Sequence, residues 1–245
     1  MSALLSYVRL EVRRALRDRS FTVFGIGMPV LMYVLFTHIG AGADADSAPW
    51  RVSAMVGMAA YGALGAALSV GTGVAEDKSL GWLRQLRVTP LRPAQVVVGR
   101  GLTGVVTVLP AILAVLVVGA LVNHVALAAW QWVALVGLLW LGTLPFTLLG
   151  LGNGYRLSSQ SAGVVNAGCM ILLSILGGLW FPAEAFPGWL ATLSRWTPAN
   201  RFGDLGWSVT SGRVPGAATV AVLLAWLAVF GGYALYAYRR AARTV

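Results

Sequence analysis

Six long runs of apolar residues fill most of the chain, and none carries a charged side chain in its middle. They cover residues 21–40, 52–75, 100–122, 126–150, 162–181 and 216–238. A helix needs about 20 mainly apolar residues to cross the hydrocarbon core of a bilayer. The runs are continuous rather than alternating, which indicates helices. The pattern therefore predicts an all-α integral membrane protein with six transmembrane helices, in a single transmembrane domain over residues 1–245.

A different pattern precedes the first run, over residues 1–20. Apolar side chains recur at helical spacing along one side, at Leu5, Val8, Val12 and Leu16. Arginines lie largely on the other side, at Arg9, Arg13, Arg14 and Arg17. A basic amphipathic helix of this kind lies in the plane of the membrane surface, with its arginines towards anionic lipid headgroups. We therefore expect an N-terminal interfacial helix that contacts membrane lipid.

Two connections between the runs are too long to be simple turns, residues 76–99 and residues 182–215. Within the second connection, two groups of residues have the spacing of short amphipathic helices: Trp189, Leu190, Leu193 and Trp196, and then Phe202, Leu205 and Val209. Aromatic side chains are typical of the membrane–water interface. We expect an external, re-entrant helical hairpin before the last span, which dips into the outer leaflet or caps the helices.

Charge gives the orientation. The chain has a net charge of +10, although only 11% of its residues are charged and 58% are hydrophobic. With the N-terminus inside, the cytoplasmic segments hold 14 of the 18 basic residues, as expected for a protein with both termini in the cytoplasm. No soluble domain remains that would bind nucleic acid. Seventeen of the basic residues are arginine and only Lys78 is lysine, which we interpret as a compositional bias of the source.

Groups that would support catalysis or ion coupling are missing from the spans. No Asp, Glu, Lys or Arg lies within a run away from its ends, whereas ion-coupled transporters place such residues inside the membrane. His38 and His124 are expected at the interface. With Cys169 they form no metal-ligand set, and no serine has a histidine on a facing helix. The sequence predicts no catalytic residue, no metal site and no cofactor on this chain.

A phosphate-binding loop is also missing. Such a loop reads Gly-x-x-x-x-Gly-Lys-Ser/Thr, so that backbone amides surround the phosphates. The only Lys-Ser pair is Lys78-Ser79, and Thr72 and Asp77 occupy the two glycine positions. The carboxylate of Asp77 would repel a phosphate. The chain therefore does not bind ATP by this device, and we expect that it is not an enzyme by itself.

The cytoplasmic connection at 76–99 carries a distinctive segment. Leu80, Leu83 and Leu86 follow helical spacing, and Pro90 ends the helix. The acidic pair Glu76 and Asp77 stands near its start, and Arg84 and Arg87 stand near its end, which suits a helix dipole. Mixed charges around Trp82 indicate a docking surface rather than a loop that only obeys the inside-charge rule.

These features resemble the ABC-2 type transporter permease family. The acidic start, Gly81 and the run Leu-Arg-Val-Thr-Pro-Leu at 86–91 resemble the coupling-helix loop of that family. The run Gly-Gly-Leu-Trp-Phe-Pro at 177–182, with Pro-Gly-Trp-Leu at 187–190 and Trp-Thr-Pro at 196–198, resembles the end of its fifth span and its external re-entrant helices. The order of these parts matches across nearly the whole chain. The loop departs from the pattern in Lys78-Ser79-Leu80 and in Trp82, where smaller or β-branched residues are common.

The resemblance implies the membrane subunit of an ATP-driven exporter in the bacterial plasma membrane. A separate ABC ATP-binding subunit would hold the ATP and Mg, and a second permease subunit, identical or unlike, would complete the transport path. The substrate would be amphipathic or hydrophobic, such as a drug, an antibiotic or a lipid-like molecule. A different function stays open, in which the chain is a non-transporting anchor or sensor module that binds a cytoplasmic partner through the same loop.

The resemblance also implies roles for individual residues. Four residues would contact the ATPase: Glu76, Gly81, Trp82 and Arg84. Three would form part of the outer gate: Trp180, Phe181 and Pro182. Three are candidates to line the substrate path: Tyr61, Asn166 and Met170. Asn166 also has a physical motive, since an amide in lipid needs a partner or a polar cavity. Tyr61 and Met170 are equally consistent with packing.

Overall fold

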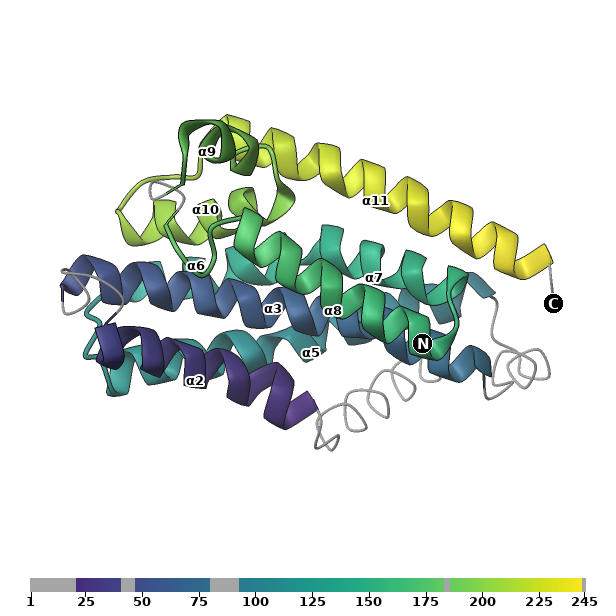
Figure 1. The fold of residues 1–245 in the computed structure, drawn as a ribbon, viewed down its shortest axis with the longest axis horizontal. Coiled ribbons are helices and arrows are strands. Elements are labelled where there is room, and N and C mark those ends of the chain that lie inside the picture. Colours follow the sequence, from purple (N-terminus) through teal and green to yellow (C-terminus); the bar gives the residue numbers. More distant parts are fainter. Residues whose placement is uncertain (1–20, 41–46, 80–92, 183–185, 244–245) are drawn as a thin grey trace.

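The computed structural model describes residues 21–40, 47–79, 93–182 and 186–243, and their regular secondary structure is entirely helical. A first helical stretch consists of the π-helix η1 (Phe21–Gly27), the α-helix α2 (Met28–Leu35) and the π-helix η2 (Phe36–Gly40). The helices that follow are α3 (Ala48–Ser79), α5 (Pro93–Leu121), α6 (Ala129–Gly142), α7 (Leu144–Arg156), α8 (Ser159–Leu176), α9 (Gly188–Ser194), α10 (Pro198–Thr210) and α11 (Ala217–Arg243). The long helices run alongside one another in a bundle (Figure 1).

Four helical segments of the described chain are long and apolar enough to cross a membrane: Ala48–Ser79, Ala129–Arg156, Ser159–Leu176 and Ala217–Ala241. Two shorter apolar helices, Gly25–His38 and Val106–Leu121, lie within the first and third apolar runs. The expected all-helical membrane architecture is confirmed in this coarser form, and the count of six spans stays a prediction. The expected interfacial helix at 1–20 and the core of the cytoplasmic segment, 80–92, lie outside the described residues.

Two expected boundaries were wrong, and glycine explains both. The fourth apolar run was expected to end at residue 150, but helix α7 continues to Arg156 through Gly150, Gly152 and Gly154. These glycines face other helices, so they allow close packing instead of ending the helix. The fifth run was expected to reach residue 181, but α8 ends at Leu176, and Gly178 then adopts a left-handed φ of 72°.

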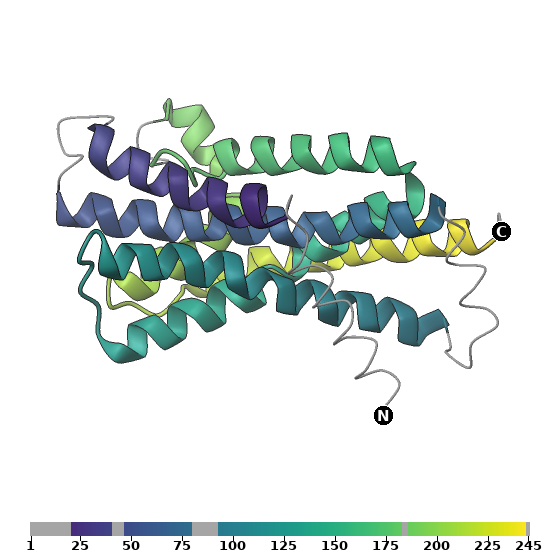
Figure 2. The same cartoon turned by 90° about the horizontal axis from the view of Figure 1, so that it is seen from below.

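Helix α3 forms the centre of the bundle. It packs against α2, α5, α7, α8 and α10, with α8 on one side and α5 on the other (Figure 2). Of its 18 most apolar consecutive residues, 83% are buried inside the protein. Glycine and alanine occupy positions on all sides of α3, so several neighbouring helices can approach its backbone at once. Small residues all round the helix therefore explain why this span, rather than a more hydrophobic one, is central.

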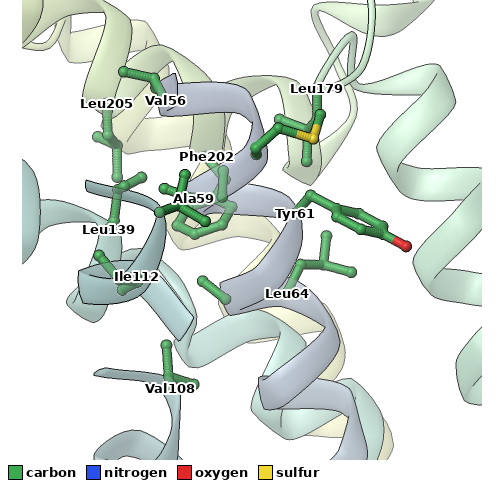
Figure 3. Packing of buried hydrophobic residues seen from close by; sticks show 14 of the residues in the cluster. Val56, Ala59, Tyr61, Leu64, Val108, Ile112, Leu139, Leu179, Phe202 and Leu205 are labelled. Carbon is green, nitrogen blue, oxygen red and sulfur yellow. The ribbon is translucent and has the colours of Figure 1, made fainter. Parts of the chain in front are cut away.

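Larger side chains fill the spaces between α3 and its neighbours. Leu139 of α6 and Ile112 of α5 pack on one side of α3, while Tyr61 and Leu179 lie on the other (Figure 3). Phe202 of α10 is fully buried and packs on Phe146 of α7, with ring centroids 5.3 Å apart. By contrast, only 17% of the corresponding stretch of α8 and 22% of that of α11 are buried. These two helices present most of their apolar surface outward, as lipid-facing helices do.

The backbones of α3 and α7 come into direct contact. A Cβ atom added at Gly71 would overlap the carbonyl oxygen of Gly150, and one added at Gly154 would overlap the carbonyl oxygen of Gly71. Gly150 and Gly154 are four residues apart, the small-xxx-small spacing that permits close crossing of membrane helices. We call this contact the glycine crossing.

The second long connection, residues 182–215, contains the helices α9 and α10, while its external, re-entrant placement stays a prediction. In α9, Trp189 and Leu193 are exposed, whereas the apolar face of α10 that begins with Phe202 is buried. The hydroxyl oxygen of Thr197 accepts a hydrogen bond from the Asn200 N–H at 3.2 Å and so caps the start of α10. At its other end, the Gln131 amide donates to the Val209 carbonyl at 2.8 Å.

The glycine crossing generates a stability prediction. Gly71→Ala places a methyl group against the Gly150 carbonyl, so the helices must separate, and the free energy of unfolding should fall by about 2–3 kcal/mol. The control is Gly168→Ala on α8, where an added Cβ atom meets nothing within 4 Å. Unfolding of the two purified variants in the same detergent measures the difference. Equal stability of both variants would contradict the crossing.

Candidate functional site

A chain of hydrogen bonds between two buried asparagines and two half-buried side chains connects four helices. The Tyr233 hydroxyl of α11 donates to Asn153 Oδ1 of α7 at 2.9 Å, and Asn153 Nδ2 donates to Asn166 Oδ1 of α8 at 2.8 Å. Asn166 Nδ2 then donates to two acceptors on α3, the Leu68 carbonyl and Thr72 Oγ1, both at 3.1 Å. We call Thr72, Asn153, Asn166 and Tyr233 the asparagine network.

Burial makes these hydrogen bonds consequential. The exposed fraction of Asn153 is 5% and that of Asn166 is 4%. A buried amide without partners costs several times what a hydrogen bond contributes. Each amide here has a donor and an acceptor in use, and the geometry holds only if the four helices keep their relative rotation. The network therefore fixes the rotation of α8 and α11 against the α3–α7 pair.

Glycines beside the network explain how its members come so close. Gly152 lies against the ring of Tyr233, and Gly154 lies against the backbone of Gly71. A larger side chain at either position would push α11 or α3 away from Asn153. The Gly-Asn-Gly sequence at 152–154 thus places one amide where two neighbouring helices reach it.

Two of the three candidate path residues, Asn166 and Met170, lie at the contact between α3 and α8, and Tyr61 lies close to it on α3. Asn166 and Met170 are one turn apart on α8, and the Met170 side chain lies against Gly65 of α3. Tyr61 lies one turn before Gly65 on α3. Its side chain is buried and points away from Leu139 and Ile112 (Figure 3). The Asn166 amide has partners within the protein, in three hydrogen bonds, and its role in lining the path stays a prediction.

The three candidate gate residues follow the end of α8. The ring of Trp180 packs edge-on against Tyr61, with centroids 5.4 Å apart and an interplanar angle of 81°. Its indole N–H is buried and has no acceptor among the described residues. Phe181 is 44% exposed, and its ring packs against that of Phe36 of η2, with centroids 5.8 Å apart. Pro182 is half-buried. The structure thus joins the gate segment to the first helical stretch and, through Tyr61, to the α3–α8 contact.

Of the four candidate ATPase contacts, one is described. Glu76 is exposed in the last turn of α3, at the same end of the bundle as the C-terminal end of α11 and opposite to α9 and α10 (Figure 1). Gly81, Trp82 and Arg84 lie outside the described residues. Position at a helix end and exposure are what a docking residue needs, and Glu76 has both.

Sequence reasoning missed Asn153, Thr72 and Tyr233. Asn153 lies between two glycines, beyond the expected end of the fourth span at residue 150 and before the fifth. The sequence did contain a signal for Asn153. The spacing of Gly150 and Gly154 marks one face of a helix, and Asn153 lies next to that face. Within the described residues, no three His, Cys, Asp or Glu side chains gather as a metal-ligand set.

Comparisons with known proteins give a consistent result. The family model for ABC-2 type transporters matches residues 2–205. A bacterial relative, "Putative transport permease YvfS" of Bacillus subtilis (strain 168), is 28% identical over 225 residues, which is 90% of this chain and 90% of the relative. The match to the family model includes Thr72, Asn153 and Asn166 and ends before Tyr233.

The asparagine network generates a second stability prediction. Asn166→Leu removes three hydrogen bonds and leaves the Asn153 amide donor unpaired, so the free energy of unfolding should fall by about 1–2 kcal/mol. Tyr233→Phe removes one bond and should cost about 0.6 kcal/mol. Unfolding in mixed micelles measures both, with Gln160→Leu, an exposed amide in the first turn of α8, as the control. A loss for Gln160→Leu as large as for Asn166→Leu would contradict the role of the network.

Proposed function

The chain belongs to the ABC-2 type transporter family and is a membrane permease of an ABC transporter, and from this premise we propose that it is the exporting subunit of a bacterial plasma-membrane complex. It moves an amphipathic or hydrophobic substrate outward. The energy comes from ATP, hydrolysed with Mg on a separate ATP-binding subunit. The observation that carries the proposal is the family match over residues 2–205, which extends from the N-terminal segment into α10.

The ATP-binding subunit docks at the end of the bundle where α3 ends. Glu76 is exposed there, and the residues that follow in the sequence are the candidates Gly81, Trp82 and Arg84. No phosphate-binding loop is present in the sequence, since Thr72 and Asp77 occupy its glycine positions. This supports a division of labour in which the permease moves the substrate and its partner supplies the hydrolysis.

The substrate class follows from the surfaces at the α3–α8 contact. The polar atoms of Asn166 are engaged with Asn153 and α3, so the amide supports the helices rather than offering a free polar group. The remaining side chains along this contact, Tyr61, Met170 and Trp180, are aromatic or soft and apolar. Such surfaces favour amphipathic or hydrophobic molecules over hydrophilic polymers. A second permease subunit, identical or unlike, packs against the outward-facing surface of α8 and completes the path.

We also propose six spans with both termini in the cytoplasm and a re-entrant external hairpin made of α9 and α10. The basic residues support the orientation, because the cytoplasmic segments would hold most of them. The exposed Trp189, Leu193 and Trp196 support placement of α9 at the outer membrane interface.

Cysteine labelling tests the orientation. Arg213 lies in the exposed segment between α10 and α11, and Arg239 is exposed near the other end of α11. In a Cys169→Ser background, Arg213→Cys should react with a membrane-impermeant maleimide in intact cells. Arg239→Cys should react only after the membrane is permeabilised. Reaction of both cysteines in intact cells, or the reverse order, would contradict the proposed orientation.

Charge reversal tests the docking site and the function together. Glu76→Arg reverses a charge at the proposed interface, so it should reduce co-purification of the ATP-binding subunit from the native host. The matched control is Arg213→Glu, an exposed charge reversal at the opposite end, which should leave the complex intact. In reconstituted vesicles, an amphipathic fluorescent dye should stimulate ATP hydrolysis by the intact complex. A complex that binds its partner but never responds to such dyes would support the anchor or sensor function instead.

A further inference from the structure

The inner end of α7 has no glycine to close it. Leu157 donates its N–H to the Asn153 carbonyl at 2.9 Å and then turns extended, with φ −98° and ψ 164°. A helix that ends in this way leaves its last carbonyl groups without helical donors, and these carbonyls form the negative end of the helix dipole. Many helices solve this with a left-handed glycine just after the end, but Leu157 and Ser158 stand here.

The ammonium group of Lys78, from the last turn of α3, lies at this end of α7. Lys78 Nζ donates to the carbonyl oxygens of Leu157 at 2.7 Å, Tyr155 at 3.0 Å and Gly154 at 3.4 Å. Three carbonyls that converge on one point match an ammonium group, which is a compact charge with three donors. A guanidinium is a flat fork that suits paired acceptors in one plane. The chain uses arginine seventeen times and lysine once, at this position.

Other contacts extend this link into a rigid inner block. About two turns away from Lys78, the glycine crossing holds the backbones of α3 and α7 together. The asparagine network ties the same two helices to α8. Beyond α7 only Leu157 and Ser158 separate the capped end from α8, and Ser158 caps α8 by accepting a hydrogen bond from the Ser161 N–H at 3.3 Å. A displacement at the end of α3 is thus passed to the start of α8 through Lys78.

We propose that Lys78 is the positioning residue that passes movement from the ATPase docking segment to α8. The inference rests on the proposed function, because α3 leads directly into the segment proposed to contact the ATP-binding subunit. When the end of α3 shifts, Lys78 carries the α7–α8 turn and the first turn of α8 with it, while Asn166 holds α8 to α3 further along the helix. Without the lysine, the ATPase still docks and hydrolyses ATP, but the first turn of α8 no longer follows. This separates the role of Lys78 from that of Glu76, whose reversal removes docking itself.

A label on α8 tests this without knowledge of the substrate. In a Cys169→Ser background, Gln160→Cys carries a spin label at the first turn of α8, where Gln160 is exposed. The permease with its ATP-binding subunit is reconstituted in phosphatidylethanolamine–phosphatidylglycerol vesicles. Label mobility is measured before ATP, after ATP and after trapping with ATP and vanadate, and ATP hydrolysis is measured once ATP is added. With Lys78 present, we expect ATP to change the mobility of the label.

Lys78→Met should retain ATP hydrolysis but reduce the ATP-dependent change in label mobility by about fivefold or more, the loss expected when two sites are uncoupled. Lys78→Arg keeps the charge but not the three-way geometry, and should lose at least half of the change. It serves as the decisive variant if Lys78→Met does not fold. Arg156→Met, which removes an exposed charge from the last turn of α7, is the matched control and should behave like the parent.

The outcomes separate the inference from the proposed function. Lys78→Arg or Lys78→Met with the full ATP-dependent change overturns the role of the lysine. So does a parent complex that hydrolyses ATP while its label does not respond. A loss in Arg156→Met equal to that in Lys78→Met overturns it as well, because any charge at this turn would then suffice. If no ATP-binding subunit associates and no ATP is hydrolysed, the proposed function fails and the inference fails with it.

Discussion

The direct backbone contact between α3 and α7 is the constraint on which the other contacts depend. Gly71, Gly150 and Gly154 bring the two helices closer than any side chain would allow. Lipid offers no hydrophobic driving force between helices, so close packing and hydrogen bonds must hold the bundle together. At this separation the short amide of Asn153 can reach α8, and the four-carbon side chain of Lys78 can reach the end of α7. A wider crossing would break both connections.

Polar groups in this protein hold helices in place more than they offer sites to a ligand. Asn153 and Asn166 use each other and α3 as partners, and Tyr233 adds α11 to the same chain of bonds. Helix α10 follows the same principle with side chains that donate to backbone carbonyls, Trp207 Nε1 to Ser53 at 3.1 Å and Asn200 Nδ2 to Gly177 at 3.1 Å. Aromatic and apolar surfaces remain for the contact between α3 and α8. A transport path along this contact would therefore discriminate by shape and apolar area.

Hydrophobic pattern was enough to predict where helices form, because a backbone in lipid must satisfy its own hydrogen bonds. It also predicted the buried face of α10, since the spacing of Phe202, Leu205 and Val209 is local information. Helix ends were harder to predict. The fourth run was expected to end at residue 150, but Gly150 lies inside a helix and marks a contact with α3, which only the partner helix reveals. Asn166 was found because an amide in an apolar run is conspicuous, whereas its partner Asn153 was hidden beside glycines. The single lysine was interpreted as compositional bias, whereas the structure places its ammonium group among three carbonyl oxygens.

Two of the four helices joined by the asparagine network, α3 and α8, differ in length, and this has a consequence for the surrounding lipid. With 32 residues, α3 is about 48 Å long, well beyond the ~30 Å hydrocarbon core, whereas α8, with 18 residues, is about 27 Å long. Packed side by side, they cannot both match one bilayer thickness. The central α3 is shielded by protein, whereas most of α8 faces outward from this chain. A helix of 18 residues is at the short end of the range that crosses a bilayer, so a thicker bilayer has to thin beside α8 or favour its association with another helix, and acyl-chain length acts on the most exposed of the helices that the network joins.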